Sequence, residues 1–298
     1  MKCTGRGLRL FGPLFLLSFD FCSYTVSSNN EKKNYPRFRF ALEPLDSIDK
    51  NEETHRADFP FSGELHKRRY PVRALRYWWL NLVIHEEAER LDHPPTIADV
   101  GCDTGIIKRF ILPVKGSRWI GLDIITDRPG LETARYDELH RCDFDEGLPL
   151  ADGSVDIAIF SHVLEHLPRP EVTMAEVFRI LKPGGLLLLG VPTAPKFIGK
   201  LRERQFEKQL AAGTRVRGQH IHVFWKQRLR DLAERTGFRV EFCSGTSLIR
   251  KKGSKLEDYG AWIRFNQIGA ALVPSLGQEL CMQLRKESGE SAVEFDRV

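Results

Sequence analysis

Short apolar runs alternate with amphipathic segments along most of this 298-residue chain. Helical spacing follows several of the runs, at residues 105–112, 169–181 and 226–236. Buried parallel strands read as nearly continuous apolar runs, and strands that alternate with helices form doubly wound sheets. The pattern therefore predicts an α/β fold with a doubly wound, seven-stranded, mostly parallel sheet. Its strands are expected at residues 96–100, 118–122, 139–142, 155–160, 186–191, 238–243 and 280–284.

The connection after the second expected strand is short for a crossover helix. It runs from Ile124 to Asp137 and contains Pro129-Gly130, a dipeptide typical of turns. We therefore expect a loop there. This loop would lie near the carboxyl ends of the strands, where sheets of this kind bind their ligands.

The same pattern divides the chain into three parts. Residues 1–62 show little periodicity and are predicted to form a leader and a loosely ordered polar arm. Residues 63–92 are predicted to hold an N-terminal helix, because Leu75, Trp78, Trp79 and Leu82 recur at helical spacing. The main domain is expected at residues 93–290, with residues 192–225 as an insertion that covers the substrate.

Composition indicates an ordinary globular protein, with 42% apolar residues and a net charge of +5. Six cysteines without C-x-x-C spacing indicate neither a zinc module nor a disulfide framework, and they suit the cytoplasm. The apolar run from Leu10 to Phe19 resembles the core of an export signal, but it is too short to span a bilayer. We predict a cytoplasmic protein without a transmembrane segment, with export as the alternative.

The strongest indication of a ligand site in the sequence follows the first expected strand. There Asp99-Val100-Gly101-Cys102-Asp103-Thr104-Gly105 leads from a strand through a glycine turn toward a helix. Glycines let the backbone turn tightly and approach a ligand without a Cβ in the way. The first amides of a helix can bind a carboxylate or a phosphate. The segment therefore predicts one wall of a ligand site.

An acid ends the second expected strand, eighteen residues beyond Gly105. This residue, Asp123, is placed to accept both ribose hydroxyls of an adenosine-containing cofactor. A dinucleotide fingerprint would need glycines at positions 103 and 106, where this chain has Asp103 and Ile106. Asp103 would repel a pyrophosphate, whereas a sulfonium and an ammonium group tolerate nearby carboxylates. The charges therefore argue against a dinucleotide.

Together these segments resemble the motifs of class I S-adenosylmethionine-dependent methyltransferases, and most closely the small domains called type 11. The resemblance extends in family order through Cys142-Asp143-Phe144, residues 156–167 and residues 181–185. It implies a Rossmann-like fold and S-adenosylmethionine as the cofactor. By this resemblance, Asp123 would bind the ribose, Asp99 and the glycine turn the methionine end, Asp143 and Phe144 the adenine, and Ser161 the sulfonium region. The expected cofactor-binding residues are Asp99, Gly101, Cys102, Asp103, Gly105, Asp123, Ile124, Asp143, Phe144 and Ser161.

The chain departs from the family pattern at Asp103, where the family most often has a third glycine. Aspartate tolerates a left-handed backbone better than most residues do. We therefore expect the turn to survive, and the affinity for the cofactor is the property that the departure affects.

Four histidines are the candidate catalytic residues: His162, His166, His220 and His222. A histidine near the transferred methyl group could take the proton of an attacking hydroxyl, although His220 and His222 could instead only seat the loop before Trp225. The run from His162 to His166 also matches the H-x-x-E-H pattern of inverted zinc peptidases, but it straddles a strand end. Magnesium prefers oxygen ligands, and the run offers only Glu165 and His166. We therefore expect no metal ion.

Residues 196–255 are strongly basic, with 16 Lys or Arg against 5 Asp or Glu. Such a run is typical of solvated helix faces, or of a site for an anionic substrate such as RNA, and no RNA-binding signature accompanies it.

We predict an S-adenosylmethionine-dependent methyltransferase that acts on oxygen or nitrogen of a small-molecule, glycan or lipid acceptor. An RNA methyltransferase and a non-catalytic cofactor-binding protein of the same fold are the alternatives.

Overall fold

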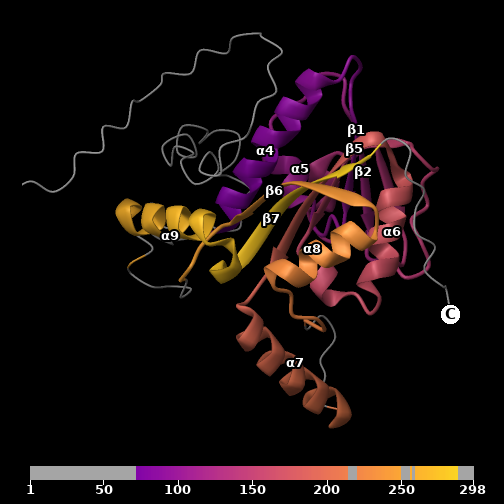
Figure 1. Cartoon of the computed structure of the whole chain (residues 1–298). Helices are drawn as coiled ribbons and strands as arrows, with labels where there is room; N and C mark the ends of the chain where they lie inside the picture. The colour runs from indigo at the N-terminus through magenta and orange to yellow at the C-terminus, as the bar shows by residue number, and fades with distance from the viewer. Residues whose placement is uncertain (1–71, 214–219, 250–255, 257–258, 288–298) are drawn as a thin grey trace, which may run out of the picture. The chain divides into compact units, whose positions relative to one another are not determined.

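A seven-stranded sheet forms the centre of the structure, a computed structural model that describes residues 72–213, 220–249, 256 and 259–287 (Figure 1). The predictions for residues 1–62 and 63–71 lie outside these residues, and the predicted domain boundaries stay predictions. All seven expected strands are present. They are β1 (Thr96–Val100), β2 (Arg118–Asp123), β3 (Glu138–Arg141), β4 (Val155–Ser161), β5 (Leu181–Pro192), β6 (Phe238–Gly245) and β7 (Glu279–Lys286).

The strand order is β3-β2-β1-β4-β5-β7-β6. Four neighbouring pairs, from β3 to β5, are parallel, whereas β7 runs antiparallel to both β5 and β6. The doubly wound, mostly parallel class predicted from the sequence is therefore confirmed. The chain winds outward from β1 in one direction and from β4 in the other, so the topological switch point lies between β1 and β4. Ligands of such sheets bind at that point, beyond the carboxyl ends of the strands.

Helices cover both faces of the sheet (Figure 1). One face packs in a core cluster with Phe178 and Leu229, and the other face packs in a second cluster with Trp79 and Phe110. Because both faces of the central strands are buried, these strands have no solvent-facing side, which explains their nearly continuous apolar runs. The helices that carry these side chains are α6 (Pro170–Ile180), α8 (Lys226–Arg235), α4 (Val72–Arg90) and α5 (Ile106–Phe110).

The expected loop between β2 and β3 contains only η1 (Leu131–Ala134), a short 3-10 turn. Two helices were not predicted, α7 (Lys196–Ala211) and α9 (Gly260–Leu272). Helix α7 lies within the expected insertion and exposes Phe197 and Leu201, so its apolar residues form no buried stripe that a pattern could show. Within the described residues, no helix has the length and apolarity needed to cross a membrane.

Candidate functional site

The glycine turn after β1 lies at the switch point, where sheets of this class form the crevice that binds their ligands. The amide of Gly101 donates to the carbonyl of Leu122 in β2 at 2.8 Å. Gly101, Asp103 and Gly105 have φ values of 81°, 49° and 71°, in the left-handed region that glycine and, less readily, aspartate adopt. A Cβ at Gly101 would lie 2.2 Å from Cγ2 of Val163. The turn therefore requires glycine at this position, and Asp103 preserves its shape as expected.

Asp123 lies over this turn at the end of β2. Its buried carboxylate accepts hydrogen bonds from the amides of Asp103, at 2.8 Å, and Ile125, at 3.0 Å. The guanidinium of Arg128, on the loop after β2, lies 3.9 Å from Asp123 and 3.2 Å from the carboxylate of Asp103. A carboxylate can accept about four hydrogen bonds, so Asp123 retains capacity for a ligand.

Asp99 lies in β1, just before the turn, with only 1% of its surface exposed. The hydroxyl of Tyr136 donates to its Oδ2 at 2.6 Å, whereas its buried Oδ1 has no hydrogen-bond partner among the described residues. Burial raises the pKa of Asp99 to about 7 although the Tyr136 hydrogen bond lowers it, and the charges of Asp123 and Asp103 add to the rise. Tyr136 was not a sequence candidate, because nothing in its local pattern indicated a contact with β1.

The remaining predicted cofactor residues differ in what they present to solvent. Ile124 is 41% exposed, and Asp143 is exposed and accepts a hydrogen bond from the amide two residues on, at 3.0 Å. The hydroxyl of Ser161 is buried and has no hydrogen-bond partner among the described residues. Cys102 and Phe144 have buried side chains, and the Phe144 ring belongs to a core cluster. These two residues can therefore offer a ligand little more than their backbone.

The loop after β4 carries His162 in a left-handed conformation with a φ of 59°, and its amide donates to the carbonyl of Gly190 at 2.8 Å. Its Nε2 lies 3.2 Å from Oε1 of Glu279, a buried residue at the start of β7. Glu279 also accepts hydrogen bonds from Arg76 of α4, one of them at 3.0 Å. Burial raises the pKa of Glu279, but the charges of Arg76 and His162 outweigh it and lower the pKa to about 2. Glu279 therefore stays ionised and orients the imidazole.

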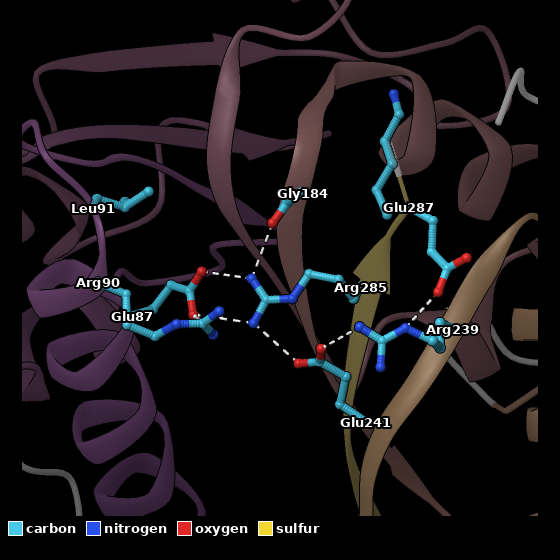
Figure 2. A pocket seen from close by; sticks show the side chains of 9 residues that line it. Glu87, Arg90, Leu91, Gly184, Arg239, Glu241, Arg285 and Glu287 are labelled. Atoms are coloured by element: carbon cyan, nitrogen blue, oxygen red, sulfur yellow. Dashed lines mark hydrogen bonds and ion pairs between the residues drawn. The ribbon is translucent and has the colours of Figure 1, made fainter. Parts of the chain in front are cut away.

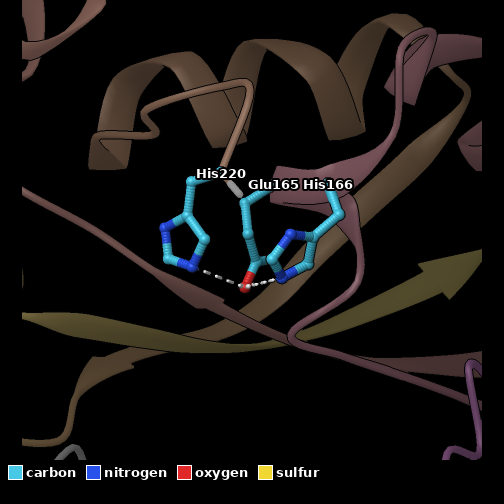
Figure 3. Close-up of side chains that lie close together, drawn as sticks. All are labelled: Glu165, His166 and His220. Carbon is cyan, nitrogen blue, oxygen red and sulfur yellow. Dashed lines mark ion pairs between the residues drawn. The ribbon is translucent and has the colours of Figure 1, made fainter. Parts of the chain in front are cut away.

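A second buried carboxylate lies among three of the predicted catalytic histidines. Glu165, in η2 (Leu164–His166), is 1% exposed. Its Oε1 lies 3.6 Å from Nδ1 of His162, 3.7 Å from Nε2 of His166 and 4.0 Å from Nε2 of His220. Figure 3 shows the His166 and His220 rings on either side of this oxygen. Burial raises the pKa of Glu165 to about 7, although the charge of Arg76 lowers it.

His220 reaches this cluster because its segment is tied to η2. The backbone of residues 221 and 222 donates two hydrogen bonds to the carbonyl of Glu165, at 2.7 and 3.2 Å. The His220 ring then stands edge-on to His166, with centroids 4.8 Å apart. The ring of His222 lies instead against the carbonyl of Pro168, at 3.4 Å. The structure thus brings three of the four predicted histidines together and directs His222 away from them.

A charged depression lies at the opposite end of the sheet, where β5 and β6 begin (Figure 2). Arg285 at its centre is buried and hydrogen-bonds to both oxygens of Glu87, at 2.5 and 3.1 Å, and to Glu241 at 3.0 Å. Arg239 at its edge pairs with Glu241 as well. Since glutamates already neutralise these arginines, the depression joins α4 to the sheet and offers an anionic ligand little free charge.

The fold and the crevice have counterparts in known proteins. The model of the methyltransferase-domain family matches residues 67–241, more than half of the chain. The chain belongs to this family. Its fold is the Rossmann-like fold of class I methyltransferases, and its cofactor is S-adenosylmethionine, as expected from the sequence.

Individual relatives of this methyltransferase-domain protein cover it only in part. A probable S-adenosylmethionine-dependent methyltransferase of Mycolicibacterium smegmatis is 32% identical over 190 residues, 61% of this chain and 66% of that protein. An uncharacterized 37.1 kDa protein in transposon TN4556 of Streptomyces fradiae is 34% identical over 102 residues, 32% of this chain and 29% of that protein. The chain therefore spans less than two thirds of either relative.

Solved structures show the same fold. The S-adenosylmethionine-dependent methyltransferase of Mesorhizobium loti matches with a TM-score of 0.52 and 19% identity, over 72% of this chain and 100% of that chain. A putative sarcosine dimethylglycine methyltransferase of Galdieria sulphuraria matches with a TM-score of 0.50 and 17% identity, over 81% of this chain and 98% of that chain. At these identities the matches establish the fold and leave the substrate open.

Proposed function

We propose that this protein transfers the methyl group of S-adenosylmethionine to an oxygen or nitrogen atom of a small-molecule, glycan or lipid acceptor. The observation that carries the proposal is the position of His162. Val163, the next residue, packs over Gly101, so the backbone of His162 belongs to the segment that covers the turn expected to bind the cofactor. Glu279 holds that imidazole in place.

The described residues fit the cofactor. The buried Oδ1 of Asp99, which has no hydrogen-bond partner among the described residues, suits the ammonium group of the methionine end. The absence of a Cβ at Gly101 leaves room for the side chain of Val163, which packs over the turn. Asp123 would accept the ribose hydroxyls. The exposed apolar side chain of Ile124 and the carboxylate of Asp143 would meet the adenine. The other members of the expected set, Cys102, Asp103, Gly105, Phe144 and Ser161, would contribute mainly the turn and the crevice walls.

Methyl transfer requires little more than alignment of the acceptor atom with the methyl group and removal of the acceptor's proton. S-adenosylmethionine would supply a methyl group on a positively charged sulfur, which would keep the electron pair of the broken carbon–sulfur bond. The acceptor would have to lie in line with that bond, so that its lone pair forms the new bond to carbon. Nε2 of His162 lies 3.2 Å from Oε1 of Glu279, so a proton on Nε2 would face that carboxylate and leave Nδ1 to take the acceptor's proton.

Replacing His162 tests this assignment. The protein is first incubated with S-adenosylmethionine that carries a labelled methyl group and with fractions of cell extract that contain small molecules, lipids, glycans or RNA. The label that each fraction gains is then measured. With the labelled acceptor, His162→Gln is expected to lower kcat by about 10²- to 10⁴-fold, the range of general acid–base catalysis, with the cofactor Kd unchanged.

His93→Gln is the matched control, because His93 pairs with Asp156 at the amino end of the sheet. A kcat for His162→Gln equal to that of the control would remove the role of His162. Label in the RNA fraction would favour the RNA methyltransferase, and label in no fraction would favour the non-catalytic alternative.

Cofactor binding is expected to weaken as the pH falls from 7 to 6. The pKa of Asp99 is raised to about 7, so its carboxyl group is mostly protonated at pH 6 and must lose a proton to pair with the ammonium. The ammonium itself stays protonated at both values, since α-amino groups titrate near about 8. The affinity should therefore fall by up to about tenfold over this unit.

Calorimetry in two buffers of different ionisation enthalpy measures both the affinity and the released proton. Asp99→Asn should bind more weakly at pH 7 and lose nothing further at pH 6. Equal affinity of the unaltered protein at both pH values, without proton release, would contradict the role of Asp99.

A cytoplasmic location is also part of the proposal. The cofactor is made and consumed in that compartment, and the spacing of the six cysteines suggests no disulfide framework. Fractionation of cells that express the full chain, followed by detection with an antibody, tests this assignment against export.

A further inference from the structure

The cluster of Glu165, His166 and His220 has the composition of a metal site. One ligand atom from each residue, a carboxylate oxygen or an imidazole nitrogen, lies within 4.8 Å of the other two. Figure 3 shows the two imidazoles directed at the same oxygen of Glu165 from different segments of the chain.

The carboxylate of Glu165 lacks the partners that the other buried acids of the crevice have. Neither of its oxygens has a hydrogen-bond partner among the described residues, although the side chain is 1% exposed. Asp99, Asp123 and Glu279 each accept at least one hydrogen bond. A buried polar group without a hydrogen bond costs about 1–3 kcal/mol, and a charged group costs more. The carboxylate therefore has oxygen lone pairs available to coordinate a cation together with the imidazoles beside it.

We propose that Glu165, His166 and His220 bind a divalent transition-metal ion that accepts imidazole ligands, with Zn²⁺ as the reference ion. Two histidines and one glutamate form a known type of zinc ligand set, whereas magnesium requires mostly oxygen ligands. This proposal departs from the expectation, drawn from the sequence, that no metal ion binds. That expectation considered only residues close together in the chain and so omitted His220.

The two distances from Glu165 to the histidines require only a small adjustment. Tetrahedral zinc, with ligand bonds of about 2.0–2.1 Å, holds its ligand atoms about 3.4 Å apart. Oε1 of Glu165 lies 3.7 and 4.0 Å from the two Nε2 atoms. The side chain of His220 is 48% exposed, so its ring has room to rotate toward the other two ligands.

Three protein ligands leave one coordination position of zinc open, as in catalytic zinc sites. The exposed side of His220 gives solvent, and an acceptor, access to that position. An acceptor hydroxyl bound there would lie near Nδ1 of His162, which is 3.6 Å from the shared oxygen of Glu165. This placement of the acceptor rests on the proposed function, whereas the binding of the ion does not.

The test is metal binding to the full chain after treatment with a chelator. Titration with Zn²⁺ by calorimetry is expected to give one ion per chain, and titration with Co²⁺ is expected to give the visible absorption of a low-symmetry imidazole site. Glu165→Gln and His220→Asn are each expected to weaken binding about 100-fold or more, since even loss of an outer partner of a ligand costs about 10- to 100-fold. His222→Gln is the matched control, because its ring is directed away from the cluster.

Each outcome of the test supports or overturns the site. Absence of stoichiometric binding, equal affinity of the variants and the control, or displacement of Co²⁺ by excess Mg²⁺ would overturn it. Unchanged cofactor affinity in Glu165→Gln and His220→Asn would show that these variants are folded. Zinc binding without methyl transfer would support the metal site and contradict the proposed function. Methyl transfer without zinc binding would support the proposed function and contradict the metal site.

Discussion

Replacing Asp123 by alanine is expected to weaken the binding of S-adenosylmethionine by at least about 100-fold. The two ribose hydroxyls would each donate to a charged acceptor, and such hydrogen bonds contribute about 1.5–3 kcal/mol each. Their joint loss corresponds to two or more factors of ten in Kd. The substitution also removes the acceptor for the amides of Asp103 and Ile125, so the turn after β1 loses a support. Calorimetric titration with the cofactor measures the effect.

Asp127→Ala is the matched control, since Asp127 is an exposed acid on the same loop. It is expected to bind the cofactor like the unaltered protein. Circular dichroism and urea unfolding establish that Asp123→Ala is folded. An affinity of the folded Asp123→Ala protein within a few-fold of the control would show that the ribose lies elsewhere.

Replacing Gly101 by alanine is expected both to destabilise the protein by more than about 2 kcal/mol and to abolish cofactor binding. The left-handed backbone at a φ of 81° costs an alanine about 1–2 kcal/mol. The new Cβ would also lie 2.2 Å from Cγ2 of Val163, so Val163 and its neighbour His162 would have to move. Urea unfolding measures the first effect, and calorimetry with the cofactor measures the second.

Gly130→Ala separates the two causes. Gly130 has a φ of 88°, but a Cβ there would meet no atom within 4 Å. It should therefore show only the backbone cost of about 1–2 kcal/mol and retain cofactor binding. Equal destabilisation of the two variants would contradict the steric argument. Cofactor binding by Gly101→Ala with normal affinity would place the cofactor away from the turn.

The central strands were predictable because side chains on both faces of the sheet are buried there. Along β4, Ile157 and Ile159 belong to one core cluster while Ala158 and Phe160 belong to the other. Successive residues therefore all need apolar side chains, and this need appears in the sequence as an uninterrupted run. The turn after β1 was predictable for a similar local reason, since the left-handed backbone at Gly101 and Gly105 favours glycine.

Contacts between distant segments were not predictable in this way. Arg76 and Glu279 are 203 positions apart, and each resembles an ordinary surface residue in its own segment. They become buried partners only when α4 packs beside the start of β7. Tyr136 meets Asp99 for the same kind of reason, because the loop after β2 returns across the end of β1. Helix α7 escaped prediction because its apolar side chains are exposed.

The seven strands, the fold class and the glycine turn with its two strand-end acids could be predicted from the amino-acid sequence, whereas the helices α7 and α9 could not. The predictable features depend on the hydrophobicity and backbone freedom of residues that are neighbours in the chain. Which histidines meet depends instead on the tertiary structure. It joined His162, His166 and His220 around Glu165, turned His222 away, and placed Glu279 behind His162. A side chain's electrostatic partners depend on distance in space. Strand pairing and loop docking bring together segments that are far apart in the chain, so these partners cannot be identified from the local sequence.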